Sequence, residues 1–460
     1  MKYSKNSSGY DYRQKVIGNS DCSADALRTK ILNSKNTEEI YEIKGNKYYI
    51  TKEMSVTDIP EDLKPGDALL FERGGVFRIL WHQGIDLPNG VIIGSYGVGD
   101  KPRFYGSQRN FADNSLWEKV EGKDNIIRTF LHGGNAGNIV FDDVACLGVK
   151  KWSLDDVKEN YDFFYDCDEY LYLYYEGNIG EDFKSIEISQ REILITYGSD
   201  CIVDNLCLKY TGAHAVAAKH GTDNTRVTNC EIGFIGGSMQ FGKTRFGNGI
   251  ELPIGATRAT VKNNYVYQCY DAGITFQSWS SCGKESHYHD IDFSENLIEN
   301  CCYGIEYFTT NTEGSGLYSD YKNISFKDNI IRFSGYEWSQ LQRPDPWMTS
   351  HIRGGQWAYM DDCENFTITD NVFDISRACI VFWWWHDESK NVIHPEPHKG
   401  LTVKNNTYYQ APTPDKRCMT FHENIPVCAE NEAEFLQAVK LFDKEPAKAV
   451  WLEQPDITKG

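Results

Sequence analysis

A recurring unit, a short apolar strand ending in Asn, constrains this chain more than any other feature of its sequence. The equivalent positions are Asn205, Cys230, Asn264, Asn296, Asn329, Asn371 and Asn406. Their separations are 25, 34, 32, 33, 42 and 35 residues. A minimal coil of about 25 residues, lengthened by loops of variable size, fits this spacing. Stacked coils bury a continuous core that no single coil can bury, so the sequence predicts an all-β solenoid of parallel strands.

The Asn column itself is predicted to be structural. Asn tolerates the left-handed backbone of a tight bend, and stacked copies can hydrogen-bond along the axis, as side-chain ladders do. We therefore expect five of these side chains to lie in one line along the solenoid: Asn264, Asn296, Asn329, Asn371 and Asn406.

Segments outside the repeat indicate the organisation of the chain. A short helix beginning near Ser23 has Leu27 and Ile31 on its apolar face and is expected to cover the open first coil. An amphipathic helix is predicted at 432–442 and is expected to pack back on the solenoid. The expected divisions are an N-terminal cap and first strand at 1–60, the β-helix at 61–410 with an insertion around 150–190, and a C-terminal tail at 411–460.

Composition excludes several classes of function. The net charge is −19 and there is no basic stripe, which argues against a nucleic-acid partner. The same charge disfavours a polyanionic substrate unless a metal bridges the repulsion. No run of about 18 apolar residues occurs, so no membrane span is expected. The oligomeric state is left open.

Cysteine usage and the N-terminus bear on the compartment. The 14 cysteines show no CxxC spacing, and most sit in apolar strand-like runs, which favours reduced and buried thiols. The first residues contain no apolar stretch of the kind that a signal peptide requires. A cytoplasmic protein is therefore expected, or a secreted one if a leader has been removed.

Three Gly-Ile segments predict a functional face. They are Gly249-Ile250-Glu251, Gly273-Ile274-Thr275 and Gly304-Ile305-Glu306. Because side chains alternate along a strand, the isoleucines should point inward, and the glycines and the polar residues outward. A column of glycines would let a ligand approach the backbone closely. The sequence therefore predicts a glycine column beside a polar column.

The carboxylates of this face are the candidate catalytic groups. Glu251 and Glu306 lie two coils apart, which places their stems roughly 9.6 Å apart. Paired carboxylates about 6.5–9.5 Å apart suit inverting glycoside hydrolysis, and a separation of about 5–5.5 Å suits retention. Glutamate side chains can lean together, so the stereochemistry stays open. Asp271 has the same outward parity and is the third candidate.

Polar and aromatic residues that should surround these carboxylates are the candidate substrate-binding groups. Aromatic rings stack on the C–H faces of sugars, and planar Arg and Asn groups bind hydroxyls. A long loop at 335–357 supplies several of them, because long loops in solenoids often serve binding. The candidates are His214, Lys219, Arg245, Asn248, Gln277, Arg343, Trp347, His351, Arg353, Trp383 and Trp384.

A metal site is not predicted. The segment HYHD at 287–290 has metal-binding side chains, but it has no partner at helical or CxxC spacing. No cofactor is predicted either.

Several motifs carry a resemblance to a known group. These are YTGAHAV (210–216), IGGS (235–238), RFGNGIE (245–251), YDAGITFQ (270–277), GIEYF (304–308) and QRPD (342–345). Together with the coil pattern, they resemble bacterial glycan-degrading proteins of the pectin-lyase-like superfamily of right-handed parallel β-helices. More distantly, they are similar to glycoside hydrolase families 120, 136 and 141.

The resemblance covers roughly 60–410 and implies a right-handed helix. It also implies glycoside hydrolysis by carboxylates on neighbouring coils, here Glu251, Asp271 and Glu306. Pectate-lyase relatives use a calcium-binding Asp cluster with an Arg or Lys base, and this sequence has no such cluster in register. Lys219 and Arg353 nevertheless keep a lyase reading open.

Three functions therefore remain, all with an oligosaccharide or polysaccharide as partner. The first is a glycoside hydrolase that cleaves a mostly neutral glycan with paired carboxylates. The second is a polysaccharide lyase or uronate epimerase. The third is a glycan-binding solenoid without catalytic activity.

Overall fold

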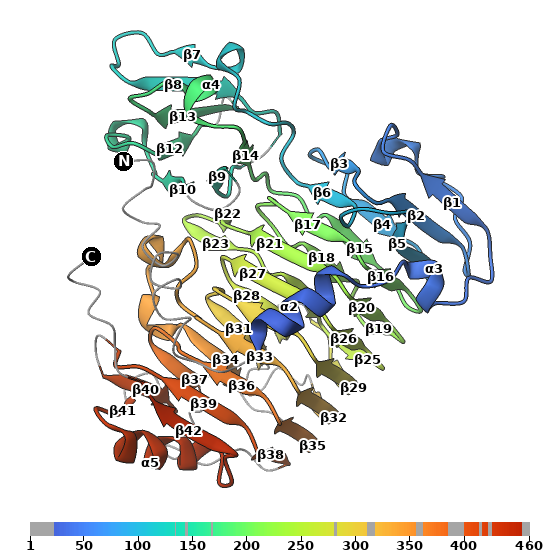
Figure 1. Cartoon of the computed structure of the whole chain (residues 1–460), viewed down its shortest axis with the longest axis vertical. Coiled ribbons are helices and arrows are strands. Elements are labelled where there is room, and N and C mark those ends of the chain that lie inside the picture. The colour runs from blue at the N-terminus through green and yellow to red at the C-terminus, as the bar shows by residue number, and fades with distance from the viewer. Residues whose placement is uncertain are drawn as a thin grey trace.

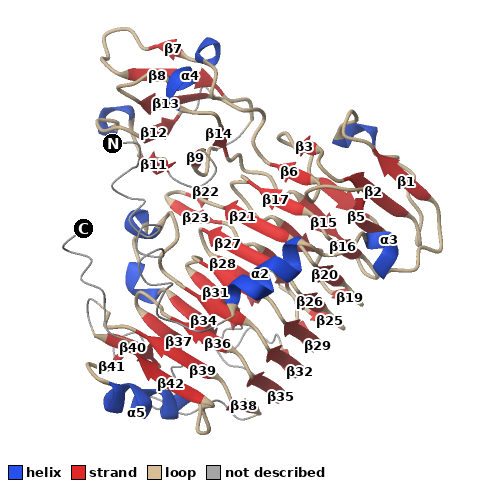
Figure 2. Ribbon diagram, in the orientation of Figure 1, coloured by secondary structure: helices blue, strands red, loops and turns tan. Residues whose placement is uncertain are grey.

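The chain winds into a right-handed parallel β-helix, in which three long sheets run side by side along one axis (Figure 1). Strands make up most of its ordered elements, and helices are few and short (Figure 2). The computed structural model describes residues 23–133, 135–142, 146–166, 169–279, 283–310, 318–355, 362–384, 400–413, 416–421 and 426–452.

Each regular coil gives one strand to each of the three sheets, which we call A, B and C. Sheet A contains β1 (Lys47–Ile50), β2 (Ala68–Glu72), β5 (Ile92–Tyr96), β16 (Ile202–Asp204), β20 (Arg226–Thr228), β26 (Thr260–Lys262), β29 (Ser286–Ser294), β32 (Ser319–Lys327), β35 (Asp362–Thr369) and β38 (Leu401–Lys404), with β19 (Thr222–Asp223) and β25 (Ala256–Thr257) beside them.

Sheet B contains β3 (Val76–Arg78), β6 (Arg103–Tyr105), β17 (Cys207–Lys209), β21 (Glu231–Ile235), β27 (Tyr265–Cys269), β30 (Leu297–Glu299), β33 (Ile330–Arg332), β36 (Val372–Asp374), β39 (Thr407–Gln410) and β42 (Lys448–Trp451). Sheet C contains β4 (Ile85–Leu87), β15 (Ile195–Tyr197), β18 (Val216–Ala218), β24 (Ile250–Pro253), β28 (Ala272–Trp279), β31 (Tyr303–Thr310), β34 (Ser350–Gly355), β37 (Cys379–Trp384), β40 (Arg417–Thr420) and β41 (Pro426–Cys428). Sheets B and C thus continue past residue 410.

The core follows the predicted alternation. Ile250, Ile274, Ile305 and Ile352 pair in register on consecutive strands of sheet C. All four are fully buried in one hydrophobic cluster that runs from the first coil to the last. This is how a solenoid buries apolar surface that a single coil would leave exposed.

The predicted Asn column is confirmed as a hydrogen-bonded ladder. Each side-chain Nδ2 donates to Oδ1 of the Asn on the next coil, at 2.9–3.0 Å from Asn264 to Asn406. The same oxygens also accept a backbone N–H from the preceding coil. Asp443 ends the ladder by accepting from Nδ2 of Asn406 at 3.0 Å. The ladder therefore satisfies its buried polar groups from coil to coil.

Two details of the predicted column are wrong. Asn205 does not stand in the ladder column. Because Asp204 lies opposite Thr228 in sheet A, Asn205 lies opposite Asn229, one residue before the ladder position of that coil. The left-handed backbone also belongs to the residue before each ladder Asn, not to the ladder Asn itself. The residues that precede the ladder positions have φ values of 53–60°. They are Asn205, Asn229, Asn263, Glu295, Asp328, Asp370 and Asn405. The tight bend and the hydrogen-bonded ladder are thus formed by adjacent residues.

The glycine column does not face outward as predicted. A Cβ at Gly249 would meet the core side chain of Val266 at 2.6 Å, and one at Gly273 would meet Ile298 at 2.6 Å. At Gly304 it would collide with Ile331. The chain bends into sheet C at these residues, so strict alternation fails there. These positions are glycine because the core leaves no room for a side chain.

Between β6 and β15 the chain leaves the solenoid, and the expected insertion at 150–190 falls within this excursion. It has its own core, which includes Phe141, Phe163, Leu171 and Ile186. Its elements are β7 (Glu118–Lys119), β8 (Ile126–Phe130), β9 (Ile139–Phe141), β10 (Cys146–Leu147), β11 (Val149–Lys150), β12 (Asp162–Tyr165), β13 (Tyr170–Tyr174), α4 (Ile179–Asp182) and β14 (Ile186–Ile188). Farther along the chain, β22 (Ser238–Phe241) and β23 (Thr244–Phe246) form a hairpin.

The predicted N-terminal helix forms as α2 (Ala24–Leu32), but it does not cover the open first coil. It contacts β27 and β30 and lies across the outside of sheet B (Figure 1). Arg28 fixes it there through an ion pair of 2.7 Å with Glu299. The short α3 (Thr37–Ile40) contacts β5 instead. Glu299, in the middle of sheet B, thus holds α2 in this position.

The C-terminal helix has the bounds that the sequence predicted, α5 (Glu432–Phe442). Its buried residues Phe435, Val439 and Phe442 join the main core, so α5 closes the last coil. Short 3-10 helices occur at η3 (Val56–Asp58), η4 (Asn114–Leu116), η5 (Leu154–Asp156), η7 (Gln340–Gln342) and η8 (Pro346–Met348).

The side chains of ten cysteines are described, all of them as thiols outside disulfides, and eight of the ten are buried. Among the described residues, no helix is long and apolar enough to pass through a membrane.

Candidate active site

The outward row of sheet C brings the candidate carboxylates into one line. Neighbouring strands place Glu251 beside Thr275, Thr275 beside Glu306, and Glu306 beside Arg353. The row begins with Asp86 on β4 and Thr196 on β15, passes Ala217 on β18, and continues to Phe382 on β37 and Thr420 on β40. Glu251 and Glu306 thus lie two coils apart, with one threonine between them.

Glu251 is buried, yet its surroundings favour the ionised form. His214 Nε2 lies 2.8 Å from Oε2, and Gln277 Nε2 donates to Oε1 at 3.0 Å. Burial alone would raise the pKa of Glu251, but His214 and the hydrogen bonds outweigh it and hold this pKa below its usual value. Glu251 is therefore a carboxylate at neutral pH.

His214 is oriented by the segment that leads into β24. The backbone N–H of Asn248 donates to His214 Nδ1 at 3.0 Å. Nδ1 is therefore an acceptor, and the proton on Nε2 points to Glu251. The Asn248 side chain accepts from the N–H of Ala272 and lies 3.4 Å from Glu251 Oε2.

The pKa of Glu306 is shifted in the opposite direction, above its usual value. Burial is the largest cause, and it raises the pKa of Glu306 to about 8, with Asp271 and Glu251 adding to the rise. Arg353, whose Nη1 donates to Oε1 at 2.7 Å, counteracts only part of it. Glu306 is therefore mostly protonated at neutral pH.

Asp271, directly before β28, is the third carboxyl group near this row. Burial raises its pKa, against the opposing charges of Arg343 and Arg353. Arg343 comes from the 335–357 loop and donates to the Tyr270 carbonyl at 2.6 Å. The long loop thus supplies both guanidinium groups near Asp271, since Arg353 lies on β34 at its end.

Two polar residues of this face were missed by the sequence analysis. Thr275 lies between the two glutamates, and its buried Oγ1 has no hydrogen-bond partner among the described residues. The same holds for the hydroxyl of Tyr303, whose ring lies 4.4 Å beneath the Arg353 guanidinium. The outward parity of Thr275 was visible in the sequence, but a hydroxyl in a strand is too common to single out.

A cleft of about 480 Å³ opens beside Glu251 on the N-terminal side of the row. Its lining includes His214, Ala217, Lys219 and Pro253. Lys219 is held at the rim by an ion pair of 2.6 Å with Asp86. A ligand can therefore reach Glu251 from this side.

Other candidate binding residues lie away from the face. Arg245 is buried and donates to the carbonyls of Gly137 and Gly237, which ties the excursion to the solenoid. His351 is fully buried and bonds Ser334 at 2.9 Å, and burial lowers its pKa to about 3. Both were predicted from their place in loops, where polarity gave no sign of burial.

The candidate tryptophans do not form a stacking surface on the described part of the face. Trp383 has the inward parity of Val381 and packs in the core against Phe421 and Phe442. Trp347 is half-buried against Phe382. The side chain of Trp384 lies outside the described residues.

No family model matches the chain, and no curated protein does. Among solved structures, a glycoside hydrolase family 136 lacto-N-biosidase from Eubacterium ramulus is 13% identical over 96% of this chain and 72% of its own, with a TM-score of 0.38.

Two further solved structures resemble the chain. An alginate lyase from a Paenibacillus strain is 10% identical over 82% of this chain and 97% of its own, with a TM-score of 0.35. A family 28 exopolygalacturonase from Yersinia enterocolitica is 10% identical over 92% of this chain and 74% of its own, also with a TM-score of 0.35. These neighbours are named as glycan hydrolases and lyases, the class that the sequence resemblance implied and the class that it left open.

Proposed function

We propose that this protein is a glycoside hydrolase that cleaves a mostly neutral oligosaccharide or polysaccharide. One observation carries the proposal: two carboxyl groups on one face have pKa values perturbed in opposite directions. Environments that hold one carboxyl protonated and the other ionised are the signature of an acid–base pair.

In this mechanism Glu306 is the general acid and Glu251 the general base. Glu306 gives its proton to the glycosidic oxygen as the bond from that oxygen to the anomeric carbon breaks. Glu251 takes a proton from a water molecule whose oxygen attacks the anomeric carbon. Exchange with solvent returns both groups to their starting states.

The anchoring of the two carboxyl groups favours inversion. His214, which holds Glu251, belongs to the coil before it, and Arg353, which holds Glu306, belongs to the coil after it. Gln277, on the coil after Glu251, holds its other oxygen, so the Glu251 carboxylate stays over its own coil and the two carboxyl groups stay near the separation of their stems, roughly 9.6 Å. This value lies just above the spacing for inverting enzymes, about 6.5–9.5 Å, and far from the spacing of about 5–5.5 Å for retaining enzymes.

The state of the candidate bases disfavours a lyase, the second candidate. Proton abstraction beside a uronate carboxylate needs an unprotonated base with a free lone pair. Both nitrogens of His214 are already engaged, by Asn248 and Glu251. Lys219 is paired as an ammonium ion with Asp86.

The test is a screen of the purified protein against neutral plant and host oligosaccharides, with products identified by mass spectrometry. On a confirmed substrate, Glu306→Gln and Glu251→Gln should each reduce turnover by about 10²-fold or more. Glu187→Gln is the matched control, because Glu187 is also buried and paired with an arginine, Arg78, but lies in the excursion.

Two results would contradict the proposal. Near wild-type turnover in both glutamine variants would move the active site elsewhere. Products with the ultraviolet absorption of an unsaturated uronate, which elimination makes, would show a lyase, because hydrolysis creates no such double bond.

A further inference from the structure

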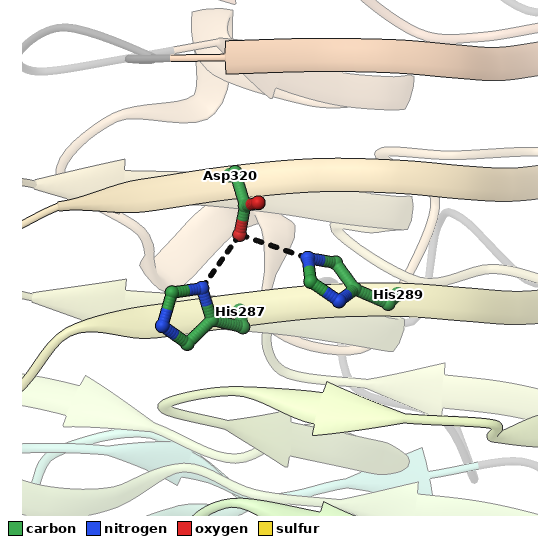
Figure 3. A group of neighbouring side chains, drawn as sticks. All are labelled: His287, His289 and Asp320. Carbon is green, nitrogen blue, oxygen red and sulfur yellow. Dashed lines mark hydrogen bonds and ion pairs between the residues drawn. The ribbon is translucent and has the colours of Figure 1, made fainter.

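The strongest unassigned cluster lies on sheet A, away from the carboxyl groups of sheet C. His287 and His289 are two residues apart on β29, and Asp320 lies directly opposite His287 on β32. Tyr288, between the histidines, points into the core and is fully buried. Both imidazoles therefore stand on the outer face of the sheet, next to one carboxylate from the following coil (Figure 3).

The donor atoms of the three residues converge. His287 Nδ1 lies 2.7 Å and His289 Nε2 2.9 Å from the same oxygen, Asp320 Oδ1. All the metal-ligating atoms of the group fall within 4.8 Å of one another. The contact of His289 is not a well-aligned hydrogen bond, so hydrogen bonding alone does not account for the position of its ring.

We propose that His287, His289 and Asp320 bind one divalent transition-metal ion of the zinc class. Two imidazoles and one carboxylate suit Zn²⁺ and its neighbours, whereas Ca²⁺ and Mg²⁺ prefer sites made of oxygen. The side chain of His287 is 44% exposed and that of His289 29% exposed. The site is thus open on its outer side, where water can complete the coordination.

Two charged neighbours support the arrangement of the ligands. Lys322 Nζ lies 2.8 Å from Asp320 Oδ2, which leaves Oδ1 facing the histidines. The carboxylate of Glu285 lies 3.7 Å from His287 Nε2, the nitrogen that would not bind the metal. A carboxylate behind a ligating histidine is the usual outer partner of a zinc site.

The bound ion would link β29 to β32, two coils of the solenoid that are joined otherwise by backbone hydrogen bonds and the core. It would stabilise the folded chain, because the ligands come together only in the fold. This inference is independent of the proposed hydrolase, since the site lies on another sheet.

A competing explanation is that the cluster is only a network of ion pairs around Asp320. Lys322 separates the two explanations. Its ammonium ion is a fixed positive charge near the proposed metal, so Lys322→Met should tighten metal binding through the lost repulsion. In a network of ion pairs the same variant would simply lose a partner of Asp320 and gain no metal affinity.

The experiment uses the full chain without a histidine tag, freed of metal by chelation and then titrated with Zn²⁺ in a calorimeter. We expect one equivalent to bind, and His289→Ala and Asp320→Asn to weaken the affinity at least about 100-fold. His132→Ala is the matched control, because His132 pairs with a single carboxylate, Glu169, at 3.4 Å. Co²⁺ should give a visible absorption spectrum that both ligand variants abolish.

Each outcome either supports the proposed metal site or overturns it. One equivalent that persists in His132→Ala, is lost in both ligand variants and tightens in Lys322→Met supports the site. Absence of stoichiometric Zn²⁺ binding, or binding that persists in the His289→Ala, Asp320→Asn double variant, overturns it. Circular dichroism and the melting temperature of the metal-free variants are the control, since they reveal any loss of binding that comes from unfolding.

Discussion

Neighbouring charges give the two central glutamates different tasks. Both are buried, so desolvation pushes both toward the neutral form. Glu251 escapes this because His214 and Gln277 donate to it, whereas Glu306, although Arg353 donates to it, lies near the other carboxyl groups, Asp271 and Glu251. The proposed acid and base thus differ in their partners rather than in their exposure.

The basic limb of the pH–rate profile should therefore report Glu306. Its pKa of about 8 means that activity should fall as the pH rises through that value, since the acid loses its proton. Asp271→Asn removes a neighbouring negative charge, so the pKa of Glu306 should fall and the limb should move to lower pH. Steady-state rates on a confirmed substrate, taken from about pH 6 to about pH 10 across the pKa of Glu306, measure this shift.

Asp271→Asn also tells which group is the second catalytic carboxyl. If Asp271, rather than Glu251, acts with Glu306, turnover should fall about 10²-fold at every pH instead of the limb moving. A profile unchanged in both height and position would contradict the electrostatic coupling described here.

The acidic limb should report Glu251. Its lowered pKa keeps it ionised until the pH falls below the usual range of a glutamate, where protonation should abolish base catalysis. His214→Phe removes the donor, so the pKa of Glu251 should rise and the acidic limb should move to higher pH. An acidic limb that stays in place in His214→Phe would remove Glu251 from the role of base.

At the scale of the element, the Asn ladder joins the coils more specifically than the core does. Apolar contacts tolerate a slip of one coil against the next, but each ladder Asn needs its neighbour at hydrogen-bond distance. Asn329 receives both Nδ2 and the backbone N–H of Asn296, and it donates to the carbonyl of Phe293. One residue thus satisfies three buried groups of the preceding coil.

Asn329→Ala should consequently be costly. It leaves two donors and one acceptor buried without partners, at about 1–3 kcal/mol each, so we expect the free energy of unfolding to fall by about 3 kcal/mol or more. Asn365→Gly is the matched control. It breaks an exposed Asn–Asn contact with Asn323, and glycine accepts the left-handed φ of 52° at this position.

Denaturant unfolding followed by tryptophan fluorescence measures both variants. The control should lose less than about 0.5 kcal/mol, as surface changes usually do. Equal losses in the two variants would mean that the ladder contributes no more than an exposed contact.

At the scale of the whole molecule, charge limits the substrate. The net charge of −19 repels polyanions at a distance, and the ionised Glu251 carboxylate of sheet C does so at close range. We expect polygalacturonate to bind weakly in the absence of divalent metal, and a neutral glycan of the same length to show no such repulsion. Calorimetry in the presence of a chelator measures both, and tight metal-free binding of polygalacturonate would overturn the preference for a neutral substrate.

The period and alternation of the sequence were enough to predict the solenoid, its ladder and the helix at 432–442. They also predicted that Glu251 and Glu306 share an outward row. These features depend on which residues recur at which spacing, and a strand's pleat turns that spacing directly into a face.

Tertiary structure alone decided what each residue meets. Glycines at the bend face inward because the backbone turns there, and α2 lies on sheet B because Glu299 binds Arg28. The HYHD segment is joined by a third side chain of the metal-binding kind, Asp320, from one coil later. The opposite pKa shifts of the two glutamates likewise arise from partners and burial brought by other coils. Loop lengths set which coils and loops come together, and no local pattern encodes the path of a loop.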